Sequence, residues 1–463
     1  MNFTDIDAAY AAFAQELWIP GVAAGIVQDG RLVHVTTVGR ADVEAARPIA
    51  PATGFRIASM TKNMTALAIL SLRDKGRLAL DAPVAEYVPQ FASVRPATLD
   101  SAPVTVRHLI THTAGFVTDD PWGDRVLGMT PAELDAMMAT GTLFARPPGI
   151  AFEYSNLGYG FAGRVITNVS GEPYQSYIRR TILAPLGMDR TTFDAFAALR
   201  EDYAQPYRLD DGQWSRERIE PDGEVGAMGG LVTTVPDYAR YVAFLLSAWP
   251  ARDDPEQGPV RRASVRELAL WHAPPFPIDG HPNTPTAYGD GLMSSLDPKL
   301  GRLLHHSGGL PGYGSHVLML PERGWGVFAF GNKTYAPMSR MTWRVAEMLW
   351  DAAPPRVVAT PSAALKRAVE AIVAAYAAGR IEVAASVFAV NFLLDTPARF
   401  RDAELAGLKA TLGEGRLESI EPTHALAGRF TLACEKGRLK GTIILSPDAQ
   451  PGIQKLTLTA EAA

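Results

Sequence analysis

The sequence predicts an α+β fold in which an antiparallel sheet, built from strands near both ends of residues 1–352, carries an inserted helical lobe. Residues 21–39 alternate around Asp29-Gly30, which is a strong signal for a two-residue hairpin. Helical patterns dominate residues 60–245. A second hairpin is predicted late in this part of the chain, where the runs 302–307 and 315–320 precede a turn at 321–324 and the run 325–330. Strands from both ends therefore close one sheet, and we expect the functional site in a cleft between sheet and lobe.

A small C-terminal α+β domain is expected beyond a linker rich in alanine and proline at residues 351–361. We place the domain boundary between residues 352 and 353. The second domain shows helical patterns and then alternating runs typical of an antiparallel meander (helices at 364–379 and 402–412, strands at 428–434, 438–445 and 453–459). It offers no obvious pair of nucleophile and base, so we expect a packing or oligomerisation module, and a homo-oligomer is one of the states considered.

Composition excludes several classes of partner. The 463 residues carry a formal net charge of -5 and no long block of Lys or Arg, so nucleic acid is not expected as a partner. No apolar run is long enough to span a bilayer, so no membrane association is expected. The single cysteine, Cys434, cannot form an intrachain disulfide. The first residues lack the basic and apolar regions of a secretory signal, which predicts a cytoplasmic protein, or a periplasmic or secreted one if a signal peptide has been removed.

Ser59 is the first candidate nucleophile. A short extended run, residues 55–58, stops at Ser59, and residues 60–76 form a helical pattern ending on Lys75-Gly76. Positions three apart share a helix face, so Lys62 lies within reach of the Ser59 hydroxyl. The free N–H groups at a helix start favour an oxyanion. A lysine buried in the apolar stretch that follows loses its proton more easily, which suits a base toward serine.

Ser-x-x-Lys alone is a weak signal, since roughly one match is expected by chance in a chain of this length. Two further motifs strengthen it, Tyr154-Ser155-Asn156 and His306-Ser307-Gly308. With Ser59-Met60-Thr61-Lys62 they resemble, in order, the three motifs of the serine β-lactamase-related superfamily. The resemblance is strongest to the branch of class C β-lactamases, DD-peptidases, D-aminopeptidases and amidases, and family VIII carboxylesterases. Four supporting stretches share the resemblance, which covers about residues 10–350 (80–84, 108–115, 185–188 and 229–231).

The resemblance implies a β-lactamase/transpeptidase-like fold and an acyl-enzyme mechanism. Ser59 would attack a carbonyl, while Lys62 and Tyr154 share the proton transfer, with either of them as the base. Asn156 would hold the substrate amide or Lys62. Neither a cofactor nor a metal is expected.

The resemblance also implies how the pocket is completed. The backbone N–H groups of Ser59 and Gly309 would form the oxyanion hole. A late edge strand carrying His306, Ser307 and Gly308 would line the pocket opposite. Substrate choice would be set by loops at residues 117–128 and 274–288. Aromatic residues in these loops suggest an apolar pocket wall (Trp122, Phe276 and Tyr288).

His306 stands where many penicillin-recognising relatives carry lysine. A lysine is a permanent cation for a substrate carboxylate, whereas a histidine is only partly charged near neutral pH. We therefore expect a hydrolase of small esters or amides that turns over short-chain esters faster than penicillins. A D-amino-acid-specific peptidase or amidase, a DD-peptidase and a weak β-lactamase remain alternatives.

Three other interpretations compete with this one. His108 and His112 have the i, i+4 spacing of zinc ligands, but the His-Glu-x-x-His pattern is absent. The Gly-x-Ser-x-Gly elbow of α/β-hydrolases fails because Ile57 and Thr61 flank Ser59. The third is a non-catalytic sensor on a penicillin-binding fold, against which the intact Ser59, Lys62 and Tyr154 argue.

Overall fold

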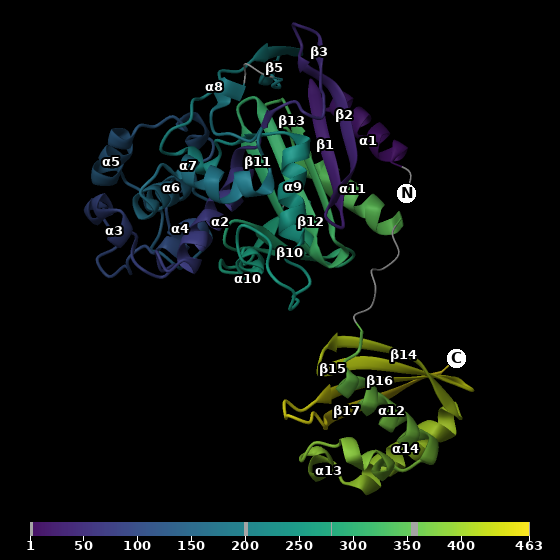
Figure 1. Ribbon diagram of the computed structural model, residues 1–463. Coiled ribbons are helices and arrows are strands. Elements are labelled where there is room, and N and C mark those ends of the chain that lie inside the picture. The colour runs from purple at the N-terminus through teal and green to yellow at the C-terminus, as the bar shows by residue number, and fades with distance from the viewer. Residues whose placement is uncertain (1–2, 199–201, 279, 353–359, 463) are drawn as a thin grey trace. The chain divides into compact units, whose positions relative to one another are not determined.

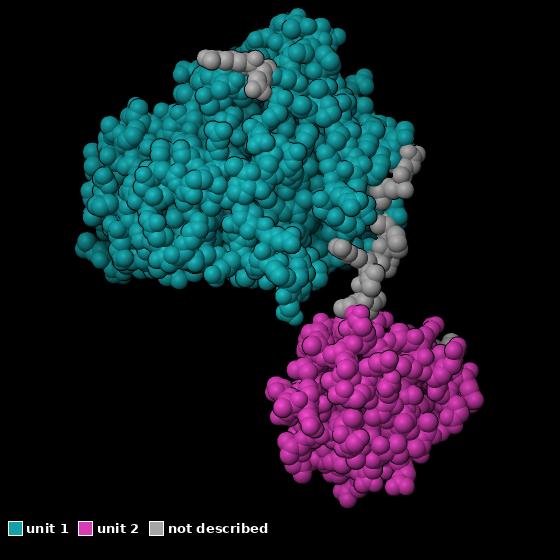
Figure 2. All heavy atoms as spheres, in the orientation of Figure 1, with its two compact units in different colours: residues 1–354 teal, residues 355–463 magenta. Residues whose placement is uncertain are grey.

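The structure is a computed structural model that describes residues 3–198, 202–278, 280–352 and 360–462. The chain divides into two compact units, residues 1–354 and 355–463 (Figure 2). Most of the linker expected at 351–361 lies outside the described residues. Among the described residues, no helix has the length and apolar character needed to cross a membrane.

A nine-stranded sheet forms the centre of the first unit (Figure 1). Its order is β3-β2-β1-β13-β12-β11-β10-β9-β8, and every neighbouring pair is antiparallel. The first and last strands of the unit meet at β1 and β13, where Val22 pairs with Gly331. This confirms the predicted closure of one sheet by early and late strands. The strands are β1 Gly21–Gln28, β2 Arg31–Asp42, β3 Arg47–Pro48, β8 Phe276–Ile278, β9 His281–Tyr288, β10 Met293–Asp297, β11 Gly301–Leu310, β12 Tyr313–Leu320 and β13 Trp325–Gly331.

Helices cover both faces of this sheet. The terminal helices α1 (Thr4–Glu16) and α11 (Met338–Ala352) share one apolar core with one face. On the other face α9 (Val235–Leu246) and α2 (Thr61–Asp74) belong to a larger core that continues into the helical lobe. The remaining helices are α3 Val84–Tyr87, α4 Val106–Ile110, α5 Pro131–Thr140, α6 Asn156–Ser170, α7 Tyr174–Ile178, α8 Ala195–Ala198 and α10 Arg262–Glu267. Two small two-stranded sheets join β4 Phe55–Arg56 to β7 Val232–Thr233 and β5 Tyr207–Asp210 to β6 Gln213–Arg216.

The second unit is a four-stranded antiparallel sheet, in the order β14-β15-β16-β17, with helices packed on it. The predicted helices are present, and the second begins earlier than expected, at Ala398. A fourth strand, β14, was not predicted. The elements are α12 Ala363–Ala378, α13 Phe392–Asp395, α14 Ala398–Leu412, β14 Gly415–His424, β15 Ala427–Cys434, β16 Gly437–Leu445 and β17 Ile453–Ala462. The small α+β C-terminal fold is thus confirmed.

Candidate active site

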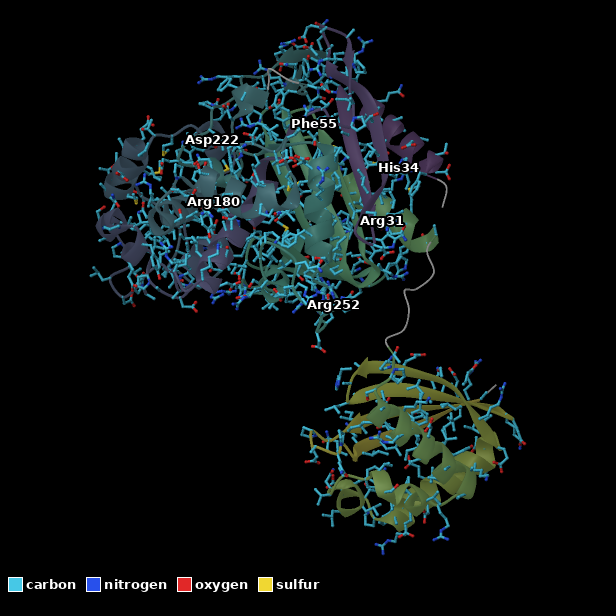
Figure 3. All side chains as sticks on the ribbon, in the orientation of Figure 1. Arg31, His34, Phe55, Arg180, Asp222 and Arg252 are labelled. Atoms are coloured by element: carbon cyan, nitrogen blue, oxygen red, sulfur yellow. The ribbon has the colours of Figure 1, made fainter. Side chains whose placement is uncertain are left out.

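Ser59 lies at a sharp turn between β4 and α2. Phe55, labelled in Figure 3, opens β4, and the 3₁₀ turn Ala58–Met60 leads into α2 at Thr61. Ala58 has a φ of 50°, in the left-handed region that non-glycine residues seldom adopt. The turn therefore presents Ser59 beside the start of a helix, as predicted, although the α-helix proper begins two residues later. The Ser59 side chain is 8% exposed, so its hydroxyl reaches the cavity from a largely buried position.

Lys62 is fully buried behind Ser59. Its ammonium donates to Ser59 Oγ at 3.0 Å, to Asn156 Oδ1 at 2.7 Å and to the Met228 carbonyl at 2.8 Å. These three acceptors match the three donors of an ammonium group. Burial lowers the pKa of Lys62 to about 8, while neighbouring aspartates oppose this shift. Lys62 is therefore held in contact with Ser59 and needs little change of pH to become a neutral amine.

Tyr154 lies close to both Ser59 and Lys62. Its ring centroid is 5.0 Å from the Lys62 Nζ atom. Burial raises the pKa of Tyr154 well above its usual value, and a hydrogen bond with Ser59 opposes the shift. The rejected zinc candidate His112 packs behind it, with ring centroids 4.2 Å apart, and its Nδ1 accepts a hydrogen bond from the Ser155 N–H at 3.1 Å. His112 thus supports the Tyr154 segment.

His108, the other member of that pair, has a different role. It closes a capping box at the start of α4, where its Nδ1 accepts from the Thr105 N–H. Among the described residues, no group of three or more His, Cys, Asp or Glu side chains could hold a metal ion.

Asn156 begins α6 and contacts Lys62 directly. Its Oδ1 accepts from Lys62 and its Nδ2 donates to Asp120 Oδ1, so both ends of the amide are used within the protein. Asp119 accepts from the Asn156 backbone N–H at 2.7 Å. Of the two contacts expected for Asn156, the structure contains the one with Lys62.

The third motif lies on β11, and its histidine is electrically neutral. His306 Nδ1 lies 2.6 Å from the Ser307 carbonyl, which can only accept, so Nδ1 carries the proton. Nε2 then accepts from the Tyr288 hydroxyl at 2.8 Å. Burial lowers the pKa of His306 to about 3, with a further contribution from the charge on Lys62. The partial positive charge expected at this position is therefore absent.

The glycines of the third motif allow β11 to approach the nucleophile. A Cβ atom on Gly308 would lie 2.2 Å from the Ile57 carbonyl oxygen. A Cβ on Gly309 would lie 2.7 Å from the ring of Tyr335. Glycine is required at Gly308 because β11 runs directly against the backbone that leads to Ser59.

These residues meet at a cavity of about 390 Å³. Of the predicted site residues, Ser59, Tyr154, His306, Ser307 and Gly309 line it. Lys62, Asn156 and Gly308 lie behind this lining. Five further residues line it that were not singled out from the sequence, although the first three belong to the loop 117–128 expected to set substrate choice (Asp120, Pro121, Asp124, Met293 and Tyr335).

The loop at 117–128 contributes carboxylates rather than the expected apolar wall. Trp122 is 48% exposed and is not among the lining residues. Asp124 accepts a hydrogen bond from the Tyr335 hydroxyl at 2.9 Å. Burial and the neighbouring Asp120 raise the pKa of Asp124 to about 7. The other two expected wall residues do not line the cavity either: Phe276 stacks on Phe152 with centroids 4.1 Å apart, and Tyr288 bonds to His306.

Sequence comparison gives a match to the family model described as Beta-lactamase over residues 6–349. Among curated relatives, protein flp of Staphylococcus aureus is 28% identical over 315 residues, which are 68% of this chain and 60% of the relative. Esterase EstB of Burkholderia gladioli is 34% identical over 236 residues, 48% of this chain and 58% of the esterase. The chain thus spans about 60% of the length of these relatives.

Two solved structures share the fold. The octameric penicillin-binding protein homologue of Pyrococcus abyssi has a TM-score of 0.67 and 24% identity, with 100% of this chain and 99% of the other covered. A D-stereospecific amidohydrolase of a Streptomyces species has a TM-score of 0.60 and 24% identity, with 75% and 98% covered.

Proposed function

The chain belongs to the β-lactamase family, and on this premise we propose that it is a serine hydrolase that cleaves small carboxylic esters or amides through an acyl-enzyme on Ser59. The observation that carries the proposal is the buried Lys62 ammonium, 3.0 Å from the Ser59 hydroxyl, at the wall of a cavity. A buried lysine whose pKa is about 8 can act as a base toward serine near neutral pH.

The reaction follows from this geometry. Neutral Lys62 removes the Ser59 hydroxyl proton as Oγ attacks the substrate carbonyl, and the oxyanion forms at the backbone N–H groups of Ser59 and Gly309. Tyr154, whose raised pKa keeps its hydroxyl protonated, passes a proton to the leaving group and recovers one from Lys62. Water then attacks the acyl-enzyme with the same groups acting in reverse. This assigns the base role to Lys62 in acylation.

Ester hydrolysis is favoured over penicillin hydrolysis because His306 is neutral. A neutral imidazole cannot offer an ion pair to the carboxylate that penicillins carry. The 34% identical Burkholderia gladioli esterase supports the same choice. The D-stereospecific amidohydrolase with the same fold supports amide hydrolysis as the second candidate. A DD-peptidase and a weak β-lactamase rank below both.

A substrate panel tests the proposal. Wild type and Ser59→Ala are assayed on p-nitrophenyl esters, D-aminoacyl amides and a chromogenic cephalosporin. We expect the highest kcat/KM on a short ester or an amide and loss of activity in Ser59→Ala. Higher efficiency on penicillins or the cephalosporin would overturn the substrate ranking. No turnover together with no fluorophosphonate label on Ser59 would favour a binding protein over an enzyme.

Self-association and location are separate proposals. The Pyrococcus abyssi homologue with the same fold is octameric, and we propose that this chain also forms a homo-oligomer. Light scattering coupled to size-exclusion chromatography tests this, and a monomer at micromolar concentration would contradict it. A cytoplasmic location stays a prediction of the sequence.

A further inference from the structure

The charged side chains that line the cavity at Ser59 are all acidic. The ten residues that line it include Asp120 and Asp124 and neither lysine nor arginine. Lys62 lies behind the lining, and three aspartates are near enough to raise its pKa, namely Asp119, Asp120 and Asp124. One ammonium can offset only one of these three carboxylates when all are ionised. An acyl group delivered to Ser59 therefore enters a negatively charged space.

No other described residue that lines the cavity compensates. His306, the ring of the third motif, is neutral because it accepts from Tyr288 and donates to the Ser307 carbonyl. The amide of Asn156 is already bonded to Lys62 and Asp120. The carboxylates thus face the substrate without a cationic partner in the cavity lining.

Each carboxylate is fixed in place by a part of the catalytic frame. Asp120 accepts from Asn156, which holds Lys62. Asp124 accepts from Tyr335, and the Tyr335 ring lies where a side chain on Gly309 would project. Tyr335 therefore holds Asp124 near Gly309, whose backbone N–H is proposed to bind the oxygen of the substrate carbonyl. Because the two carboxylates and the nucleophile line the same cavity, an acyl group bound at Ser59 shares that cavity with them.

We propose that Asp120 and Asp124 select substrates whose acyl group carries a protonated amine, such as aminoacyl esters or amides, and reject those whose acyl group carries a carboxylate. This inference rests on the proposed serine hydrolase function and names its substrate class. Opposite charges that are shielded from water attract more strongly than in bulk solvent, whereas like charges in the same place repel. Preference by charge is therefore expected even without a dedicated pocket for the amine.

The protonation state of Asp124 should also make the preference for an amine depend on pH. Its pKa is raised to about 7, so near neutrality part of the population carries a proton on this carboxyl. A bound ammonium favours the ionised carboxylate, which releases that proton. The selectivity for the amine should therefore increase as the pH rises through about 7. It should fall again at higher pH, where the substrate amine, whose pKa is about 8, loses its own proton.

Three esters that differ only in one substituent provide the test. Ethyl alaninate, as both D and L forms, carries an ammonium group, ethyl isobutyrate carries a methyl group in its place, and monoethyl methylmalonate carries a carboxylate. On the full-length protein we expect kcat/KM to be at least about tenfold higher for one alaninate than for isobutyrate, and about tenfold lower for methylmalonate. Asp124→Asn and Asp120→Asn should each reduce the ratio of alaninate to isobutyrate several-fold.

The ratio is the decisive quantity because any general loss of activity cancels in it. Asp135→Asn serves as the matched control, since Asp135 pairs with Arg164 and does not line the cavity. Its ratio should equal that of wild type. Thermal melts of each variant verify folding, and the double variant Asp120→Asn/Asp124→Asn should lower the ratio to the one that the same two esters show in alkaline hydrolysis without enzyme.

The outcomes separate this inference from the proposed function. Ser59-dependent hydrolysis of isobutyrate without a preference for alaninate overturns the inference and leaves the hydrolase intact. If no ester is turned over, protection of Ser59 against fluorophosphonate labelling by isopropylammonium, weakened in Asp124→Asn, still supports the charge selectivity. Equal protection of Ser59 by the isopropylammonium cation and by the free isobutyrate anion would refute the charge selectivity.

Discussion

At the residue scale, the environment of Lys62 determines how the activity should depend on pH. Its pKa is lowered to about 8 by burial and is held up by Asp120 and Asp124. Because the neutral amine is the base, kcat/KM for a neutral ester should rise with pH to a plateau, with a midpoint near 8. Asp120→Asn removes a charge that favours the ammonium form, so its midpoint should move to lower pH. A pH–rate profile measures both, and an unchanged midpoint would contradict the role given to Lys62.

A second buried charge, Asp290, allows a prediction about stability. It is fully buried, and neither carboxylate oxygen has a hydrogen-bond partner in the described structure. His272 Nε2 lies 3.6 Å from its Oδ2 atom and an Arg107 nitrogen lies 3.9 Å from it. Burial raises the pKa of Asp290 to about 7. The folded state then binds more protons than the unfolded state between about pH 4 and 7, so wild-type stability falls as the pH rises through this window.

The isosteric variant Asp290→Asn lacks this charge. Its free energy of unfolding should exceed that of wild type by about 1 to 3 kcal/mol at pH 8, and the two should converge near about pH 4. Urea titrations at both pH values measure the difference. A variant that is less stable than wild type at pH 8 would mean that the contact with Arg107 outweighs the cost of burying the charge.

The sequence predicted the contacts between site residues that lie close together along the chain. Lys62 lies three positions after Ser59 on one helix face, so their contact followed from helical geometry alone. Asp120 and Asp124 gave no such signal, because the acidic residues of a segment that also contains Pro121 and Gly123 are typical of a solvated loop. Only the fold brings that loop against Tyr335 and Asn156. The neutral state of His306 also depends on a distant partner, Tyr288, and could not be read from local sequence.

At the scale of elements, the approach of β11 to the turn at Ser59 should be the contact most sensitive to added volume. A Cβ on Gly308 would meet two fixed atoms at 2.2 Å, the Ile57 carbonyl oxygen and Ser315 Oγ. A Cβ on Gly309 would meet only the half-exposed ring of Tyr335, which can move. Gly308→Ala should therefore lower kcat/KM by about a hundredfold or more, and Gly309→Ala by much less. Equal losses in the two variants would refute this interpretation of the contact.

Several strands that the sequence failed to predict lie at or next to a sheet edge. The segment 274–288 was expected to be a loop, and its residues Pro282 and Pro285 are of a type that disfavours a central strand. In the structure these prolines belong to β9, next to the edge strand β8, where missing hydrogen-bond donors are tolerated. The strand β14 is also an edge, and its pairing with β15 shifts register near Pro422. Strands with two paired neighbours, such as β12 and β13, carry the continuous apolar runs that sequence patterns detect.

At the scale of the whole molecule, each unit has its own apolar core. The two buried clusters of the first unit contain no residue of the second, and the cluster around Phe430 and Ile372 contains no residue of the first. All predicted site residues and every residue that lines the cavity belong to the first unit. The proposed catalytic residues therefore all lie within residues 1–354, and a packing or oligomerisation role for the second unit stays a prediction.

A truncation after Pro354 tests this division. Since separate cores unfold separately, the full chain should show two calorimetric transitions, and the truncated protein should retain the one that belongs to the first unit. Its kcat/KM for a short ester should lie within about threefold of the full-length value, because no group of the cavity has been removed. Ser59→Ala in the truncated protein is the control for background hydrolysis. A folded but inactive truncated protein would show that the second unit takes part in catalysis, and a single shared transition would show that the two units fold as one.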